Sequence, residues 1–334
     1  MMTRPSGGKT RTARALWYAE KGVVELREAP LPALQQGEAR VRTAFSGISR
    51  GTERLVFSGA VGQSEWERMR APMQDGALPF PVKYGYCATG VVEEGPADLV
   101  GRAVFCLHPH QDLFNAPIEA LAPIPEGVPV RRAVLAANME TALNAVWDSG
   151  AGPGDRIVVV GAGVVGLLVA MLAARLPGAT VTAVDVDESR RPIAEALGAG
   201  FARPEHATAD ADVVFHASAT GAGLNTAIAC AGLEATVVEM SWYGDKAIEA
   251  ELGGAFHSRR LKLVSSQVGL ISPGRRPRWD NRRRRDAALR LLAEPGLDAL
   301  VAEEIAFDDA PQQMPRILAP GAHGLAPVIR YPQS

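Results

Sequence analysis

DRIVVVGAGVVGLLVAMLAARLPGATVTAVD, residues 155–185, contains in order the features of a strand, a glycine turn, a helix and a second strand. The apolar, β-branched run Ile157–Val160 is typical of a strand buried on both faces of a parallel sheet. Val181–Val184 predicts a second such strand, which ends at Asp185. The stretch therefore predicts a doubly wound, Rossmann-type α/β sheet.

The glycine turn has the spacing G-x-G-x-x-G, formed by Gly161, Gly163 and Gly166, and Val164 and Val165 begin the helix. The first glycine permits the tight turn, the second lets the backbone approach a pyrophosphate, and the third lets the helix pack close to the strand. The N-terminus of the helix offers free N–H groups to phosphates. Placed between a strand and a helix, this spacing predicts a dinucleotide-binding site. A glycine-rich turn without a ligand is the alternative.

Asp185 lies where a carboxylate accepts hydrogen bonds from a ribose diol and repels a 2′-phosphate. The sequence therefore favours NAD over NADP. Arg190 and Arg191 follow shortly afterwards and leave NADP as an alternative.

The composition indicates a globular protein with two domains, because the chain has 334 residues, 47% of them apolar and 22% charged. A net charge of −2 gives no sign of a nucleic-acid or membrane partner. The three cysteines are scattered, which argues against a disulfide framework and favours a cytoplasmic setting. Residues 1–13 are expected to be a disordered tail without the apolar core of a signal peptide.

Short alternating or β-branched runs precede the glycine motif and predict an all-β lobe over residues 14–137. After Asp185 helices and strands alternate, which predicts a dinucleotide-binding domain over residues 138–269. Residues 270–334 are expected to return to the β lobe.

Three segments resemble the medium-chain dehydrogenase/reductase superfamily of the zinc alcohol dehydrogenase type: SGISRGTE at 46–53, KYGYCATGVVEEG at 83–95 and GDRIVVVGAGVVG at 154–166. The resemblance covers nearly the whole chain. It implies a GroES-like β catalytic domain, an NAD(P)-dependent oxidoreductase, and a homodimer formed near Leu261–Gly269. Further segments are similar to a zinc-less bacterial subgroup grouped with bacteriochlorophyllide-type dehydrogenases: SWYGD at 241–245, FHSRRL at 256–261 and SSQVG at 265–269.

Residues with poor zinc-binding chemistry occupy the positions where the resemblance implies zinc ligands. Ser49 stands at the cysteine position, Tyr86 at the histidine position and Cys87 at the glutamate that follows. Ala136 and Ala137 occupy the region of a third ligand. Because zinc requires about four N, S or O donors, we expect no zinc.

The cysteine cluster of the family's structural zinc lobe is also absent after Cys106. A site built from Cys87, His108 and His110 is the alternative to a zinc-free protein, but it lacks an evident fourth donor.

The resemblance places candidate catalytic residues around the substrate, with Ser49 at the position of a lost ligand. The Tyr86 phenol is expected to donate to the substrate oxygen, or else to bond a backbone carbonyl. His108 is expected to act as an imidazolium acid, or else to be a turn residue. Glu140 is expected beside the nicotinamide with a raised pKa, relaying protons; a helix N-terminal residue or a partner of Arg50 is the alternative.

The resemblance also implies cofactor contacts outside the glycine loop. Arg50 is expected to bind the diphosphate through its guanidinium, a surface arginine being the alternative. Ser241 and Gln267 are expected to contribute backbone beside the nicotinamide.

The arginine run Arg282–Arg285, with further arginines at 275, 276 and 278, is expected to form a solvated helix face with ion pairs. An anionic substrate or partner is the alternative, whereas a nucleic-acid surface would need stacking aromatics in a basic domain.

Together these observations predict a zinc-independent NAD(P)-dependent oxidoreductase acting on an alcohol/carbonyl pair in a small molecule. A C=C reductase of the enone or quinone type is one alternative. A catalytically inactive dinucleotide-binding scaffold, or a redox sensor using Cys87, is the other.

Overall fold

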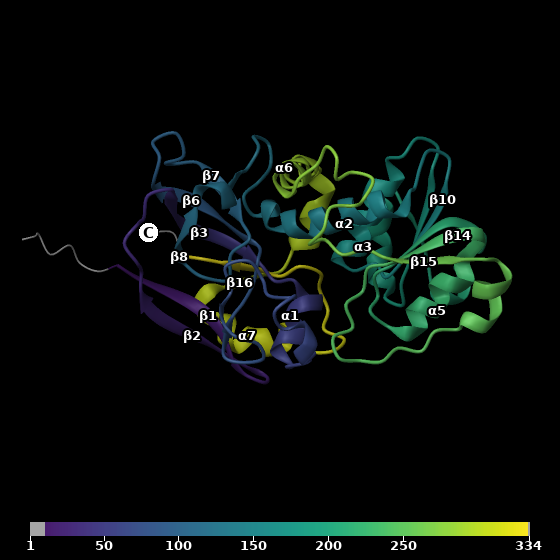
Figure 1. Cartoon of the computed structure of the whole chain (residues 1–334), viewed down its shortest axis with the longest axis horizontal. Coiled ribbons are helices and arrows are strands. Elements are labelled where there is room, and N and C mark those ends of the chain that lie inside the picture. The colour runs from purple at the N-terminus through teal and green to yellow at the C-terminus, as the bar shows by residue number, and fades with distance from the viewer. Residues whose placement is uncertain (1–10, 333–334) are drawn as a thin grey trace, which may run out of the picture.

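A parallel sheet of six strands forms the centre of one lobe, at the right of Figure 1, in the computed structural model, which describes residues 11–332. The strand order is β12-β11-β10-β13-β14-β15, which is 3-2-1-4-5-6 when the strands are counted from the first of the lobe. This order confirms the predicted Rossmann sheet. Its strands are β10 (Arg156–Val160), β11 (Thr180–Val184), β12 (Gly200–Ala202), β13 (Ala211–His216), β14 (Ala231–Glu239) and β15 (Lys262–Ser265).

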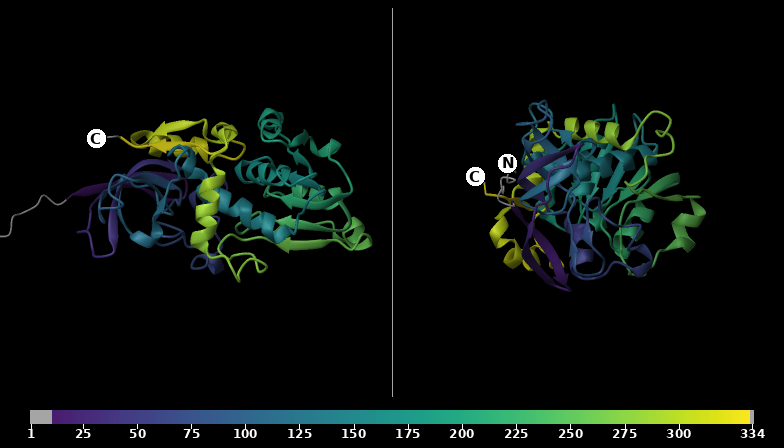
Figure 2. Two further views of the ribbon diagram at one scale, coloured as in Figure 1. Left: turned by 90° about the horizontal axis from the view of Figure 1, so that it is seen from above. Right: turned by 60° about the vertical axis from the view of Figure 1, so that its left-hand side comes forward.

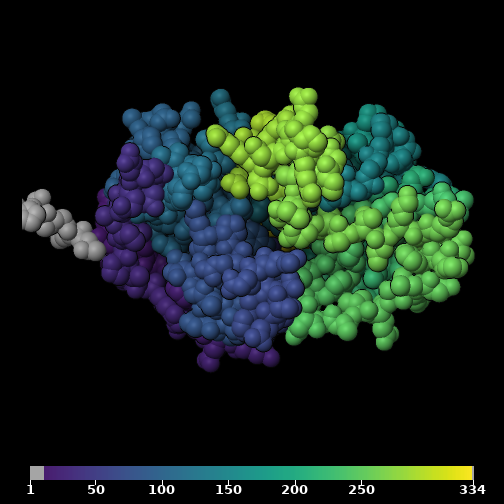
Figure 3. Space-filling model, viewed as in Figure 1, coloured from purple at the N-terminus to yellow at the C-terminus, as the bar shows by residue number. Residues whose placement is uncertain are grey.

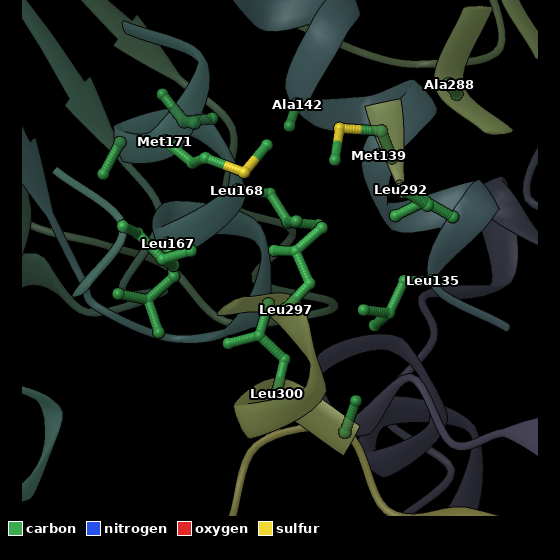
Figure 4. Packing of buried hydrophobic residues seen from close by; sticks show 14 of the residues in the cluster. Leu135, Met139, Ala142, Leu167, Leu168, Met171, Ala288, Leu292, Leu297 and Leu300 are labelled. Atoms are coloured by element: carbon green, nitrogen blue, oxygen red, sulfur yellow. The ribbon is translucent and has the colours of Figure 1, made fainter. Parts of the chain in front are cut away.

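Five helices flank or approach this sheet: α2 (Ala136–Ser149), α3 (Val164–Ala174), α4 (Arg191–Ala196), α5 (Gly221–Cys230) and α6 (Asn281–Leu291). In the core, Met139 of α2 lies between the leucines of α3 and Leu292, which follows α6 (Figure 4). Leu167 and Leu168 are fully buried. Because each such side chain stabilises the fold by about 1.5–3 kcal/mol, this core holds α2, α3 and α6 in fixed positions.

The other lobe consists of two mostly antiparallel sheets. One has the order β16-β17-β3-β6-β7-β9, with β8 paired to β3, and the other the order β2-β1-β5-β4. The strands are β1 (Thr12–Glu20), β2 (Val23–Pro30), β3 (Glu38–Gly47), β4 (Asp75–Gly76), β5 (Val82–Lys83), β6 (Ala88–Glu94), β7 (Ala103–Cys106), β8 (Leu113–Pro117), β9 (Ala122–Pro123), β16 (Glu304–Ala306) and β17 (Val328–Arg330). Two helices complete the lobe, α1 (Arg50–Phe57) and α7 (Ala310–Ile317).

The end of the chain returns to the β lobe, as Figure 2 shows in two further views. Strand β17 pairs antiparallel with β3, and Val328 lies opposite Gly47. The limits predicted for the domains stay a prediction. Residues 1–10 of the predicted tail lie outside the described residues, but β1 already begins at Thr12.

Short 3-10 helices connect the main elements at Gln63–Glu65, Ile118–Ala120, Arg132–Leu135, Glu188–Arg190, Pro204–His206, Pro295–Val301 and Phe307–Asp309, and a π-helical turn covers Leu252–Phe256. Among residues 11–332, no helix is long and apolar enough to cross a bilayer.

Candidate active site

The glycine loop between β10 and α3 has the geometry that a dinucleotide requires. Gly161 has φ +105°, and a Cβ there would lie 2.7 Å from the backbone nitrogen of Ser218. A Cβ on Gly166 would lie 1.8 Å from the carbonyl oxygen of Gly161. Gly163 caps α3 and faces open space. The loop therefore needs glycine for packing at two positions, and at the third it leaves room for a diphosphate at the helix N-terminus.

Asp185 follows β11 and is fixed beside this loop. Its carboxylate accepts hydrogen bonds from the backbone N–H groups of Ala162 (2.6 Å) and Asp187 (2.9 Å). Arg190 lies 3.2 Å from Asp187 and donates to the carbonyl of Gly324 at 2.9 Å. These two contacts hold the Arg190 side chain in place, and its role toward a cofactor stays a prediction.

A cleft of about 450 Å³ lies between the two lobes. Thr52 and Tyr86 line it from the β lobe, and Glu140 lines it from α2. Met240 and Gln267 line it from segments that follow β14 and β15. In the space-filling view, the yellow-green segment that contains α6 lies across the junction of the lobes (Figure 3). The structure therefore brings the predicted residues Tyr86, Glu140 and Gln267 into one cleft.

Tyr86 is a neutral hydrogen-bond donor in this cleft. Burial raises the pKa of its phenol, while hydrogen bonds with the side chains of Ser49 and Thr52 act in the opposite direction. Its ring packs edge-on against Tyr84, with 6.1 Å between the centroids. A phenol with a raised pKa keeps its proton at neutral pH and can donate it to a substrate oxygen.

The residues around Tyr86 do not fit a zinc ion. Cys87 is 1% exposed, and burial raises the pKa of its thiol, whereas zinc binds the thiolate. Ser49 is a weak ligand, and Ala137 offers no side-chain donor at all. Within the described part of the chain, no three His, Cys, Asp or Glu side chains are grouped to hold a metal.

Glu140 forms a buried ion pair with two arginines of α6. The Nε atoms of Arg284 and Arg285 lie 3.1 and 3.5 Å from its carboxylate oxygens. Arg284 also donates to Asn144 at 2.9 Å and to the carbonyl of Val268 at 2.7 Å. Burial raises the pKa of Glu140, and the two guanidinium groups oppose the effect without cancelling it.

The expectation of a solvated arginine face is therefore wrong for part of the run. The Arg284 side chain is 4% exposed, and both Arg284 and Arg285 line the cleft. Arg283 instead stacks over Trp279, with 4.1 Å between its Cζ and the ring centroid, and Arg282 is exposed. Successive helix residues point about 100° apart, so one helix carries both environments.

His108 lies in a setting that disagrees with its predicted role as an imidazolium acid. Its ring stacks on Phe114, with 3.7 Å between the centroids, and its Nδ1 lies 3.0 Å from the carbonyl oxygen of Pro109. Burial lowers its pKa to about 3, so the ring is neutral. It does not line the cleft, although its neighbour Leu107 does.

Arg50 is also placed differently from the prediction. Its guanidinium donates to backbone carbonyls at the end of α7 and in the loop that follows, among them those of Ile317 (3.1 Å), Gly324 (2.7 Å) and Ala322. All three guanidinium nitrogens are thus bonded within the protein. The structure gives Arg50 a role in holding this loop, and its contact with a diphosphate stays a prediction.

A buried polar network that sequence reasoning missed anchors the segment before α1. Glu53 accepts hydrogen bonds from the Tyr18 hydroxyl (2.6 Å) and the Ser49 backbone N–H (2.7 Å). His110 lies 2.9 Å from Glu53 through Nε2 and 2.7 Å from the Ser46 hydroxyl through Nδ1. Glu53 is the last residue of the segment SGISRGTE, so this segment was the one feature of the sequence that could have indicated the network. The network fixes Ser49 beside Tyr86.

A second polar group lies where β13 and β14 end. His216 bonds Glu239 at 2.8 Å and Ser218 at 2.7 Å. The backbone N–H of Ser241 donates to Glu239 at 2.7 Å, and its hydroxyl accepts from Ala219. Ser241 follows Met240, which lines the cleft, and its contact with the cofactor stays a prediction.

Comparison with known proteins gives relatives along most of the chain. It is 25% identical to D-guloside 3-dehydrogenase of Escherichia coli K12 over 313 residues, covering 84% of this chain and 89% of the relative. It is 24% identical to D-xylulose reductase A of Aspergillus oryzae over 263 residues, or 69% and 73% of the two chains. No protein-family model matches.

Among solved structures, a Sinorhizobium meliloti 1021 protein described as a zinc-binding dehydrogenase, bound to NADP, has the same fold. Its TM-score is 0.76 at 19% identity, over 96% of this chain and 99% of that chain.

Proposed function

We propose that the chain is a member of the medium-chain dehydrogenase/reductase superfamily, and that it transfers hydride between a nicotinamide cofactor and an alcohol/carbonyl substrate without zinc. The cleft between the lobes carries the proposal. It combines a neutral phenol, Tyr86, with the segments after β14 and β15, near which a nicotinamide is expected.

The proposed cofactor site is the loop Gly161–Gly166, with Asp185 directed at the adenosine ribose. The space at Gly163 supports it, and a bound dinucleotide would supply or accept the hydride. Asp185 favours NAD because its charge repels a 2′-phosphate. NADP stays an alternative, since Arg190 and Arg191 are close in sequence and the Sinorhizobium protein binds NADP.

In the proposed reaction Tyr86 binds and orients the substrate oxygen. During carbonyl reduction negative charge develops on that oxygen, and the phenol stabilises it by donating a hydrogen bond and then the proton. The Thr52 side chain bonds the phenol and directs it. Glu140, whose pKa burial raises, is proposed to relay protons from the opposite wall. The packing around Cys87 excludes water from its thiol, which does not support a sensing role.

The substrate class that we propose is a hydroxylated small molecule such as a polyol or sugar. Two relatives act on such compounds by name, D-guloside 3-dehydrogenase and D-xylulose reductase A. The cleft offers polar side chains to hydroxyl groups, among them Asn138, Thr141 and Gln267. A homodimer through the edge strand β15 also stays a proposal, supported by the half-exposed Leu263.

The test is a spectrophotometric screen with the purified protein. Polyols and sugars are offered with NAD⁺ or NADP⁺, and ketoses and enones with the reduced cofactors, after the protein's metal content has been measured. We expect turnover with an alcohol/carbonyl pair, less than one zinc in ten chains and no inhibition by EDTA. One zinc per chain would overturn the zinc-free mechanism, and turnover of enones alone would favour the C=C reductase.

A further inference from the structure

The cleft between the lobes carries a strong excess of positive charge. Arg284 and Arg285 line it from α6, and Arg68 and Arg70 line it from the β lobe. Glu140 is the one carboxylate among the described lining residues. Four guanidinium groups therefore face a single carboxylate in a recess with low-dielectric walls, which concentrates the field on a bound molecule.

The internal contacts of the cleft leave part of this charge without a counter-charge. Arg284 is bonded at all three nitrogens, so its role is structural. Arg285 is held more weakly, because it lies 3.5 Å from Glu140 and 3.4 Å from the carbonyl of Ala120. Its Nη2 has no hydrogen-bond partner among residues 11–332. One carboxylate shared by two guanidinium groups leaves a net positive charge on the α6 side.

The opposite wall adds positive charge without any carboxylate. Arg70 donates to the backbone carbonyls of Gln74 (2.8 Å) and Gly76 (3.2 Å), which leave its charge unbalanced. Arg68 is exposed, and it forms no hydrogen bond or ion pair with the described residues. An exposed arginine with free donors at the rim of a cleft, such as Arg68, suits the capture of an anion from solvent.

The cofactor does not account for these arginines. The glycine loop that suits the diphosphate is Gly161–Gly166, and none of those residues lines this cleft. The cleft lies at the other end of the proposed cofactor site, beside Met240 and Gln267. The excess charge is therefore presented to the molecule that shares the cleft with the nicotinamide.

We propose that the substrate carries an anionic group, a carboxylate or a phosphate monoester, which binds Arg285 and is attracted into the cleft by Arg68. This inference rests on the proposed function and narrows its substrate class from polyols and sugars to their acids or phosphate esters. The Glu140 carboxylate, 3.5 Å from the Arg285 Nε, also holds the Arg285 side chain against the wall.

The test compares three ligands that differ in charge but share one carbon skeleton: glucitol, gluconate and glucitol 6-phosphate. Their affinities for the NADH complex are measured through nicotinamide fluorescence, and kcat/KM is measured wherever turnover occurs. We expect an anionic member to bind about tenfold or more tightly than glucitol, as for one charge-assisted hydrogen bond. The two anions distinguish a carboxylate from a phosphate.

Substitutions test whether these arginines cause the preference for the anion. Arg285→Gln and Arg68→Gln should each reduce the preference for the anion, the first by about tenfold, while the affinity for glucitol and for NADH stays unchanged. Arg285→Lys, which keeps the positive charge, should retain part of the preference for the anion. Arg282→Gln is the matched control, because Arg282 is exposed on the same helix and does not line this cleft. Since Arg68 is exposed, its replacement leaves the fold intact.

Equal binding of the three ligands, or a preference that survives both glutamine variants, would overturn the inference. Hydride transfer to neutral substrates alone would also overturn it while leaving the proposed function standing. Tight anion binding without turnover of any substrate would instead support the anion site and contradict the proposed function.

Discussion

Replacing Gly166 with alanine tests the packing that joins the glycine loop to α3. The added Cβ would lie 1.8 Å from the carbonyl oxygen of Gly161, whereas such a C···O pair needs about 3.3 Å. The obstacle is backbone, so the helix must shift by roughly 1.5 Å against a fully buried core. Overpacking of this kind costs about 1–3 kcal/mol, which lowers Tm by roughly 2–12 °C in a domain of this size.

Gly163→Ala is the matched control, three residues away on the same loop. Its φ is −76°, and a Cβ there meets nothing within 4 Å. Alanine is a weaker N-cap than glycine, which lowers the free energy of unfolding, whereas it restricts the unfolded chain, which raises that free energy. Each effect is no more than about 1 kcal/mol. We expect an unchanged Tm, but a dinucleotide Kd raised by about tenfold, because the methyl group occupies space that the diphosphate needs.

Thermal melts and calorimetric titration with NAD⁺ and NADP⁺ measure both effects. The reasoning is refuted if Gly166→Ala is as stable as the parent protein. It is equally refuted if Gly163→Ala binds the dinucleotide with undiminished affinity.

Three further changes follow from the site. Tyr86→Phe should lower kcat by about 10²-fold or more with unchanged NADH affinity, measured by steady-state kinetics, because the proton donor is lost. Asp185→Ser should weaken NAD⁺ binding and narrow its advantage over NADP⁺ in titrations, because the charge that repels a 2′-phosphate is removed. Burial raises the pKa of Glu53, but the contact with His110 and the hydrogen bonds outweigh it, so the pKa lies below its usual 4.5. The pair therefore adds stability above that pH, and the stability is lost as the pH falls through the lower folded value. Glu53→Gln should cost about 1–3 kcal/mol at neutral pH, because it disturbs a buried hydrogen-bond network, and it should flatten this acid dependence in thermal melts.

Specific results would contradict each of these. Tyr243→Phe, outside the cleft, is the control for Tyr86, and equal losses in both variants would remove the catalytic assignment. Asp185→Ser with an unaltered cofactor ratio would show that the carboxylate does not face the ribose. Parallel pH profiles of Glu53→Gln and the parent protein would show that the buried pair does not control acid stability.

The sequence predicted the parts of the molecule that depend on local pattern. The order of strand, glycine loop, helix and acidic residue determined the parallel sheet correctly, because apolar strands and the G-x-G-x-x-G spacing are properties of neighbouring residues. Tyr86, Glu140 and Gln267 were also expected near one another, and they line one cleft. That expectation came from the family resemblance and not from the local pattern.

The errors concern side chains whose partners are remote in the chain. Arg50 bonds carbonyls of the loop at 317–324, about which its own segment carries no information. Arg284 is buried because Glu140 lies opposite it, 144 residues earlier in the chain. His108 was assigned by position, and its stacking on Phe114 depends on how the β lobe folds around it. Charge and polarity alone do not distinguish a solvated side chain from a paired one.

The position of β17 has a consequence for synthesis on the ribosome. This strand lies between β16 and β3, so a sheet begun near residue 38 is completed only by residues 328–330. The six parallel strands, by contrast, all emerge between residues 156 and 265, and they have their partners as soon as they are made. During translation the nucleotide-binding lobe is thus able to fold before this sheet is complete, while the Phe45–Gly47 end of β3, which β8 does not cover, waits for β17 and depends on protection from aggregation.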